Sequence, residues 1–241
     1  MAAVEGPSSS TDEVFPGRKA IGIYEQIKTL APGNQALEIQ IVRKKGSFLE
    51  GFAEYFTKSN RALEPRYLRK VYYCGALVNG RPSADQERLL REATILRNMD
   101  HPNIVRYEDF EWLPTVADKA FLYMEYCQTG DLASYLASQP KADVPLSKNH
   151  FWQIFNQLSS ALLYCHTGLK AWEEREIWRE PLWREPVYHR DVKEANVVIS
   201  SINEHDIRVK LCDFGFAKGA SSNVAGSFVG SRGYIAPVSF L

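Results

Sequence analysis

The stretch that decides the fold is His189-Arg190-Asp191-Val192-Lys193-Glu194-Ala195-Asn196. A second short motif, Asp213-Phe214-Gly215, begins seventeen residues after Asn196. The apolar residues that lead up to Cys212 predict a strand directly before this second motif. Either motif alone is a weak signal, but the two in this order and at this spacing are hard to obtain by chance.

Around these motifs, the chain divides into a strand-rich first half and a helix-rich second half. Alternating apolar positions and aromatic or β-branched residues predict strands over residues 37–41, 52–57, 67–73, 104–110 and 120–125. Residues 1–35 are predicted to form a flexible leader with a short helix near 24–30. This order of elements predicts an α+β fold.

Two helices have recognisable starts. Ser83, followed by Gln86, can form a capping box, and Ser147 can cap a second, longer helix. Apolar residues recur at helical spacing in both. The stripe of the first helix is Leu89, Ala93, Leu96 and Met99, and that of the second is Phe151, Phe155, Leu158, Leu162 and Cys165.

Composition excludes several classes of partner. Lys+Arg and Asp+Glu each number 29, and this balance gives no indication of a nucleic-acid or membrane-surface partner. The four cysteines, Cys74, Cys127, Cys165 and Cys212, form no C-x-x-C pair, which is typical of reduced intracellular thiols. We find no apolar segment of the length that a signal peptide or membrane span needs, and we expect a cytoplasmic or nuclear protein.

Residues 189–196 and 213–215 resemble the H-R-D-x-x-x-x-N and D-F-G motifs of protein kinases. The resemblance implies a two-lobe fold over residues 36–241, with the N-lobe and hinge over 36–126 and a partial C-lobe over 127–241. It also implies ATP and Mg²⁺ as cofactors and proteins as substrates. Residues 167–187 form an insert with a near-repeat of Trp-Arg-Glu-Pro, which is either a docking loop or an ordinary surface loop.

The resemblance implies a role for each polar residue of the two motifs. Asp191 would accept the proton of the substrate hydroxyl, and Asn196 and Asp213 would give oxygen ligands to Mg²⁺. Lys193 would contact the γ-phosphate, and a lysine there is typical of serine/threonine kinases. The alternative is a solvated loop of mixed charges.

A lysine and a glutamate upstream would complete this site. Lys70 occupies the third strand, where kinases carry V-A-I-K, and would contact the α- and β-phosphates. Arg69 competes for this role, although strand alternation turns only one of the two toward the nucleotide. Glu92 lies on the apolar stripe of its helix, where a carboxylate is costly unless paired, and Lys70 is its expected partner. The alternative is a charge at the edge of the stripe.

The remaining nucleotide contacts follow from the same resemblance. Backbone groups of Glu125 and Cys127 would bond adenine in the hinge, and Met124 would guard the back pocket. Asp131 would either contact the ribose or cap the next helix. Gly46, Gly51, Ala53 and Val198 complete the predicted nucleotide-binding set.

The hinge and the segment Phe228-Val229-Gly230-Ser231 are similar to those of NIMA-related kinases, in which Ser231 aligns with a threonine that contacts the catalytic loop. The chain departs from the family in its glycine loop at 44–51 and in Ala236-Pro237-Val238, which replaces A-P-E. It also ends at Leu241, before the helices that form the base of a C-lobe. We therefore expect a serine/threonine kinase, and the alternatives are a non-catalytic kinase-like binding module and an inactive truncated fragment.

Overall fold

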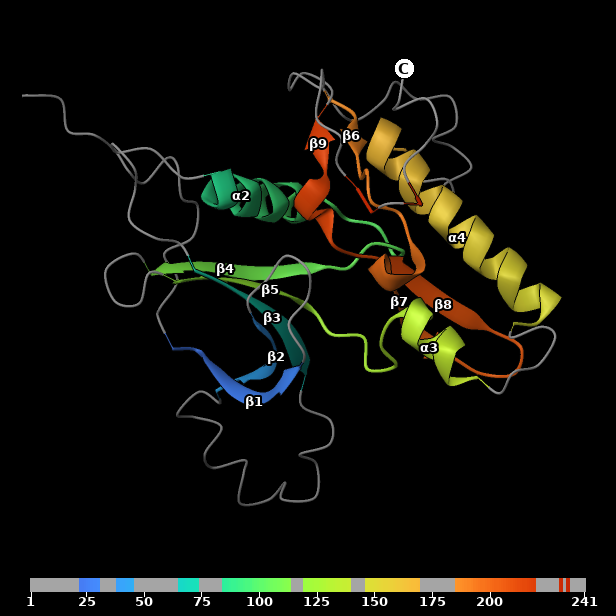
Figure 1. Cartoon of the computed structure of the whole chain (residues 1–241), viewed down its shortest axis with the longest axis horizontal. Helices are drawn as coiled ribbons and strands as arrows, with labels where there is room; N and C mark the ends of the chain where they lie inside the picture. The colour runs from blue at the N-terminus through green and yellow to red at the C-terminus, as the bar shows by residue number, and fades with distance from the viewer. Residues whose placement is uncertain are drawn as a thin grey trace, which may run out of the picture. The chain divides into compact units, whose positions relative to one another are not determined.

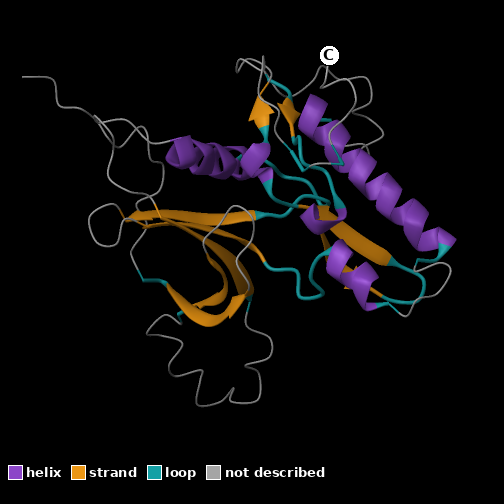
Figure 2. Ribbon diagram, in the orientation of Figure 1, coloured by secondary structure: helices purple, strands orange, loops and turns teal. Residues whose placement is uncertain are grey.

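The computed structural model describes residues 22–30, 38–45, 65–73, 84–113, 119–139, 146–169, 185–219, 230–231 and 233–234. The chain divides into two compact units (Figures 1 and 2). The first comprises Met1–Ser83 and Asp109–Tyr123, and the second comprises Ala84–Glu108 and Met124–Leu241. Residues 84–108, which the sequence assigned to the N-lobe, group with the second unit. Each unit is described by itself below.

The first unit is built on a five-stranded sheet in the order β1-β2-β3-β5-β4. Its strands are β1 (Tyr24–Leu30), β2 (Glu38–Lys44), β3 (Arg66–Tyr73), β4 (Tyr107–Leu113) and β5 (Lys119–Glu125). Tyr24, Val42 and Tyr123 form a small core, in which the rings of Tyr24 and Tyr123 stack at a centroid distance of 4.0 Å. The strands predicted near 37–41, 67–73 and 120–125 are therefore confirmed, and that near 104–110 begins later, at Tyr107.

The helix predicted near 24–30 is wrong, because these residues form β1. Pairing with β2 explains the difference: Tyr24 lies opposite Lys44 and Leu30 opposite Ile39, and these long-range contacts outweigh a weak local preference. β2 in turn pairs directly with β3, with Ile39 opposite Lys70. The strand predicted over residues 52–57 lies outside the described part of the chain.

The described part of the second unit combines three helices with two small antiparallel sheets. Its helices are α2 (Ala84–Arg97), α3 (Leu132–Ser138) and α4 (Lys148–Thr167), with short 3-10 turns η2 (Glu194–Asn196) and η3 (Phe214–Phe216). Its strands are β6 (Val187–Tyr188), β7 (Val197–Ile202), β8 (Ile207–Leu211) and β9 (Lys218–Gly219), paired as β6-β9 and β7-β8. The predicted α+β fold is confirmed.

Both predicted helices are present. On α2, Leu89, Ala93 and Leu96 are buried as expected, and Met99 is buried just beyond the helix end. The proposed cap, Ser83, lies outside the described residues. The Ser147 hydroxyl accepts a hydrogen bond from the His150 N–H (3.1 Å), so Ser147 caps α4 as predicted.

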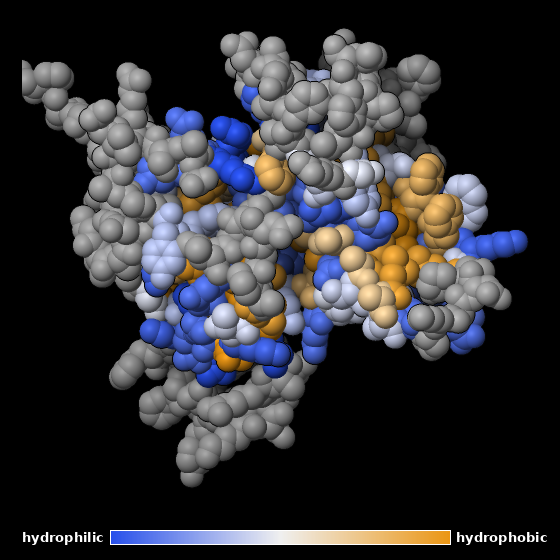
Figure 3. Space-filling view, in the orientation of Figure 1, coloured by the Kyte–Doolittle hydropathy of each residue, from blue (hydrophilic) through white to orange (hydrophobic). Residues whose placement is uncertain are grey.

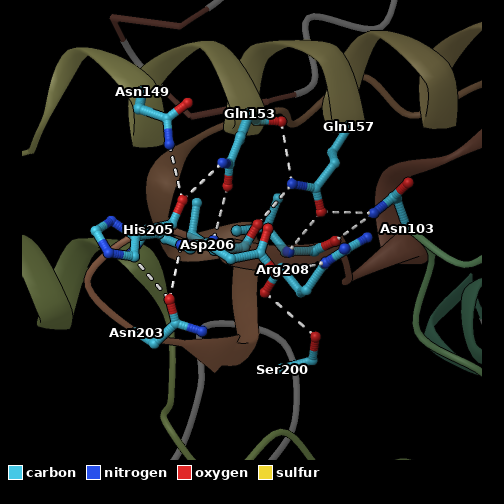
Figure 4. A network of polar contacts seen from close by, with 11 residues as sticks. Asn103, Asn149, Gln153, Gln157, Ser200, Asn203, His205, Asp206 and Arg208 are labelled. Carbon is cyan, nitrogen blue, oxygen red and sulfur yellow. Dashed lines mark hydrogen bonds and ion pairs between the residues drawn. The ribbon is translucent and has the colours of Figure 1, made fainter.

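The predicted apolar stripe of α4 is only partly buried. Phe151 and Phe155 are 55% and 53% exposed, although Cys165 is buried. Figure 3 shows hydrophobic side chains over the part of the surface where α4 lies. Ile154 and Leu158 of α4 contribute to the core. A polar face also orients the helix, because the amides of Asn149, Gln153 and Gln157 bond the backbone of β8 and of the turn before it (Figure 4).

The core of the second unit lies between α4, α3 and the β7–β8 hairpin. Its buried residues are Leu132, Ile154, Val197, Ile199, Ile207 and Val209. Among the described residues, no helix is both long and apolar enough to cross a membrane.

Candidate active site

The two sequence motifs meet at one end of the β7–β8 hairpin. Residues 189–196 lead into β7, and Asp213 follows β8. Val197 lies opposite Leu211 in the hairpin, and the Cys212 N–H donates to the Asn196 carbonyl (2.9 Å). This pairing places Asn196, the last residue of the 189–196 motif, beside Cys212, which precedes Asp213. The strand predicted between the two motifs implied this proximity.

Asp191 is the centre of a closed hydrogen-bond network. Its side chain is fully buried, and its Oδ2 accepts bonds from Lys193 Nζ (2.8 Å) and Asn196 Nδ2 (2.8 Å). Its Oδ1 accepts a bond from the Ser231 N–H (2.8 Å), and Lys193 Nζ also donates to Ser231 Oγ (2.5 Å). Burial alone would raise the pKa of Asp191, but these hydrogen bonds outweigh it and lower the pKa below its ordinary value. The carboxylate is therefore ionised and can accept or orient a hydroxyl proton.

His189 joins the 189–196 motif to the residues before Asp213. Its Nδ1 accepts the Asp191 N–H (3.3 Å), so the ring proton of the neutral imidazole lies on Nε2, which donates to the Cys212 carbonyl (2.9 Å). The edge of the ring also contacts Phe214, with centroids 4.7 Å apart. One buried side chain thus joins the catalytic loop to the segment that carries Asp213.

Asn196 and Asp213 fit the requirements of a magnesium site by their chemistry. Asn196 Nδ2 donates both to the Asp191 carbonyl (2.7 Å) and to its carboxylate, which leaves the amide oxygen as the acceptor. Mg²⁺ prefers one or two such oxygen ligands, together with waters and phosphate oxygens. Within the described ranges, no group of three His, Cys, Asp or Glu residues could hold a metal by itself. Mg²⁺ bound by Asn196 and Asp213 would therefore also need oxygen ligands from the phosphates of a nucleotide.

In the first unit, the structure separates the roles of Arg69 and Lys70. Arg69 Nε donates to Gln40 Oε1 (2.7 Å), and its guanidinium group lies over the Phe121 ring at 5.0 Å. Because neighbouring strand residues point to opposite faces, Lys70 faces the other side of the sheet, where it is 7% exposed. Lys70 thus remains the candidate, and its pairing with Glu92, a residue of the second unit that is 1% exposed, stays a prediction.

The predicted hinge is anchored to β8. The Glu125 N–H donates to the Arg106 carbonyl (2.9 Å), and the Glu125 carboxylate accepts from the Arg106 N–H (3.2 Å) and Lys210 Nζ (2.9 Å). An adenine contact at Glu125 would therefore use its carbonyl. Met124 and Cys127 are buried, and burial raises the pKa of the Cys127 thiol to about 11. The adenine contacts of Glu125 and Cys127 stay predictions.

Asp131 caps a helix, one of the two roles left open by the sequence. Its Oδ1 accepts the Ser134 N–H (2.7 Å) at the start of α3. An isolated antiparallel bridge pairs Asp131 with Val198, and the Ile199 N–H donates to the Gly130 carbonyl (2.9 Å). Asp131 and Val198, both predicted to contact the nucleotide, are thus neighbours, and a ribose contact remains untested.

Gly46, Gly51 and Ala53 lie outside the described residues, as does most of the insert 167–187. The strand order nevertheless changes the interpretation of the glycines. The predicted loop 44–51 was to join the first two strands of the sheet, but it follows β2, which pairs with β3. Residues 31–37, with Gly33, are the segment that joins β1 to β2.

Two residues near the site were missed by the sequence argument. The first is Lys210, which forms an ion pair with Glu125. It lies on β8, a strand of alternating apolar and polar residues in which a lysine is expected at the surface, and nothing in the sequence indicated Glu125 as its partner. Arg88 donates to the Gly215 carbonyl (2.9 Å) within the Asp-Phe-Gly motif. Its position four residues before Glu92, on the same helix face, was the available signal.

Comparison with known proteins agrees with this geometry. The family model described as the protein kinase domain matches residues 76–239, which is more than half of the chain. The chain belongs to the protein kinase family. Two similar proteins bear NIMA-type names, in agreement with the resemblance seen in the sequence. G2-specific protein kinase nim-1 of Neurospora crassa is 34% identical over 163 residues, and serine/threonine-protein kinase Nek2 of Homo sapiens is 33% identical over 156 residues.

These alignments cover 64% of this chain in both cases, but only 18% of nim-1 and 31% of Nek2. Serine/threonine-protein kinase ATG1a of Arabidopsis thaliana is similar at a comparable level, with 35% identity over 153 residues, 63% of this chain and 20% of its own length. The chain thus spans less than a third of each of these relatives.

Proposed function

We propose that this chain is a protein serine/threonine kinase, which transfers the γ-phosphate of ATP to serine or threonine hydroxyls of protein substrates. The single observation that carries the proposal is the buried Asp191 carboxylate, held by hydrogen bonds from Lys193, Asn196 and Ser231. Three similar proteins are named as protein kinases, and two of them as serine/threonine kinases. In the described part of the chain, Cys127, Cys165 and Cys212 form no disulfide, which supports a cytoplasmic or nuclear location.

In the proposed reaction, the substrate hydroxyl lies against Asp191 and attacks the γ-phosphorus of ATP. The bond from that phosphorus to the β–γ bridging oxygen breaks, ADP leaves, and the hydroxyl proton passes to the Asp191 carboxylate. Lys193, bonded to Asp191 (2.8 Å) and to Ser231, would neutralise the γ-phosphate. Mg²⁺, bound through Asn196 and Asp213, would supply charge neutralisation to the phosphates.

The remaining nucleotide contacts are proposed on the resemblance and on local placement. Lys70 would bind the α- and β-phosphates and Glu92 would orient it, whereas Glu125 and Cys127 would bind adenine. Asp131 and Val198, paired in the structure, would lie near the ribose and adenine. For the phosphate loop we propose residues 31–37 in place of 44–51, because they join the first two strands of the sheet.

The test separates nucleotide binding from transfer. Thermal shift of the purified chain with Mg²⁺ and ATP reports binding, and ³²P transfer to casein or myelin basic protein reports activity. We expect Asp191→Asn to keep ATP binding and to lose transfer by on the order of 10²-fold, because it removes the proton acceptor and leaves the nucleotide contacts.

Asp206→Asn is the matched control, since Asp206 pairs with Arg208 (3.0 Å) in the exposed turn before β8. Equal transfer by wild type and Asp191→Asn would refute the assignment of Asp191. ATP binding without any transfer by the wild type would favour the non-catalytic binding module.

A further inference from the structure

Two guanidinium groups hold the turn that follows Asp213. Arg88 Nε, on α2, donates to the Gly215 carbonyl (2.9 Å), and the Arg88 guanidinium carbon lies 3.9 Å from the centroid of the Phe216 ring. Arg190 Nε, on the catalytic loop, donates to the Phe216 carbonyl (2.8 Å). The two consecutive carbonyls of η3 are thus each bonded to an arginine from a different part of the second unit.

The backbone beside this turn needs such support. Asp213 has φ 64° and ψ 70°, a left-handed conformation that a non-glycine residue adopts only where its surroundings impose it. Gly215 is buried, so its carbonyl would be left without a partner in a poorly hydrated place if Arg88 were removed. The contact of Arg88 therefore bears directly on the conformation in which Asp213 presents its carboxylate.

Arg88 and Glu92 are one helical turn apart on α2, so they share a face and move together. Glu92 is the residue assigned to orient the phosphate-binding lysine. A displacement of α2 would therefore shift that glutamate and, through Arg88, also the turn beside Asp213.

We propose that Arg88 is a positioning residue, which couples helix α2 to the metal-binding conformation of Asp213. The proposal rests on the proposed kinase function. It adds that, through Arg88, the position of α2, which carries Glu92, and the conformation of Asp213 depend on one another. Arg88 does not contact the nucleotide in this scheme; it acts through Gly215 and Phe216.

The chemistry requires an arginine. The planar guanidinium group can donate in its plane to a carbonyl while its face stacks on an aromatic ring. A lysine keeps the charge but offers a point donor, which cannot serve the Gly215 carbonyl and the Phe216 ring in the same geometry. Arg88→Lys should therefore behave more like Arg88→Met than like the wild type.

The experiment compares wild type, Arg88→Met, Arg88→Lys and the control Arg97→Met, which removes an exposed arginine from the last turn of the same helix. Two quantities are measured. The first is the Mg²⁺ concentration that gives half of the ATP-induced thermal shift, and the second is hydrogen exchange of the peptide 213–219 in the chain without ligand.

For Arg88→Met we expect a half-saturating Mg²⁺ concentration raised on the order of 10-fold and exchange of 213–219 at least several-fold faster, because a charge-assisted hydrogen bond and a cation–π contact are lost. For Arg97→Met both quantities should stay within twofold of wild type. In a double-mutant cycle with Phe216→Leu, the two effects should be less than additive, since both variants remove one stacked pair.

The proposal is overturned if Arg88→Met is folded and has a lower melting temperature, but the Mg²⁺ dependence and the hydrogen exchange of 213–219 are unchanged. That outcome would mean that Arg88 contributes to stability and does not position Asp213. It is equally overturned if Arg97→Met has the same effects as Arg88→Met. If the wild type binds no ATP, the proposed function fails, and the exchange measurement still decides whether Arg88 holds the turn.

Discussion

Gln157 offers the most direct test of how this site is held. Its Oε1 accepts bonds from the Val209 N–H (2.9 Å) and Asn103 Nδ2 (2.9 Å), and its Nε2 donates to the Ile207 carbonyl (2.7 Å) and the Gln153 carbonyl (3.1 Å). Figure 4 shows this amide between α4 and the edge of β8. We predict that Gln157→Leu, which keeps a side chain of similar size, destabilises the second unit.

The magnitude follows from the backbone groups that lose a partner. Val209 and Ile207 are both 0% exposed, so the N–H of one and the carbonyl of the other become unsatisfied in the interior. An unsatisfied buried group costs about 1–3 kcal/mol. Gln157 itself is only half-buried, so water can reach part of the gap, and we expect a loss of about 2–4 kcal/mol for the two groups together. For a chain of this length, that corresponds to a melting temperature roughly 5–15 °C lower.

The assay is thermal and urea unfolding followed by circular dichroism, with Asn156→Leu as the matched control. Asn156 is the preceding residue of α4 and is exposed, so its replacement changes helix composition and leaves the β8 edge intact. The reasoning is refuted if Gln157→Leu and Asn156→Leu differ by less than about 0.5 kcal/mol, which is the usual range for surface substitutions.

Two further predictions concern other parts of the chain. Burial, with a smaller contribution from nearby Asp109, raises the pKa of Glu111, so the charge of this carboxylate lowers the stability of the folded state. We therefore predict that Glu111→Gln raises the urea midpoint of unfolding at pH 7. This gain should shrink as the pH falls through the raised pKa and vanish below the ordinary value of 4.5, and a gain that grows toward acid would contradict the assignment. Asp131→Ala should cost about 1 kcal/mol through the lost cap of α3, whereas Asp131→Asn should retain it. If Asp131→Asn keeps the melting temperature but weakens ATP binding in calorimetry, a ribose contact explains the loss, and unchanged binding excludes that contact.

The motifs around Asp191 could be predicted from the sequence because their chemistry is local. The residues from His189 to Asp213, which include the proposed catalytic and metal-binding side chains, span 25 residues, and the strand before Asp213 was evident from its apolar residues. Strand alternation also separated Arg69 from Lys70, because it leaves one of two adjacent cations on each face of the sheet, and the role of Lys70 stays a prediction. The structure adds what Arg69 does on the opposite face, where it binds Gln40 and stacks on an aromatic ring.

The errors arise where long-range pairing decides. Residues 24–30 have no clear period, and only their partnership with β2 makes them a strand. That one missed strand changes which segment joins the first two strands of the sheet, which is 31–37 and not 44–51. The α4 stripe is confirmed only in part: Leu158 packs against the core and Cys165 is buried, whereas Phe151 and Phe155 are exposed. Helical spacing groups these residues, but it does not show that Gln153 and Gln157 bond the backbone of β8.

Those hydrogen bonds also hold the strand that leads to Asp213, a proposed metal ligand. Among the described residues, β7 is the one strand that pairs with β8 along its length, yet the other edge of β8 is also occupied. The N–H groups of Ile207 and Val209 bond the side chains of Gln153 and Gln157. Farther along, the Leu211 N–H donates to the Asn103 carbonyl (2.8 Å) and the Leu211 carbonyl accepts from the Val105 N–H (3.0 Å).

This second edge adds to the apolar packing that fixes the register of β8. A shift by one residue would turn the buried side chains of Ile207 and Val209 to the other face, and it would also turn every backbone donor of the strand away from its partner. The edge is held by side chains at its start and by backbone at its end, where Leu211 precedes Asp213 by two residues. The strand is thus held on both edges up to the end where the Cys212 N–H donates to the Asn196 carbonyl (2.9 Å), and this hydrogen bonding places the two proposed metal ligands, Asn196 and Asp213, at the same end of the β7–β8 hairpin.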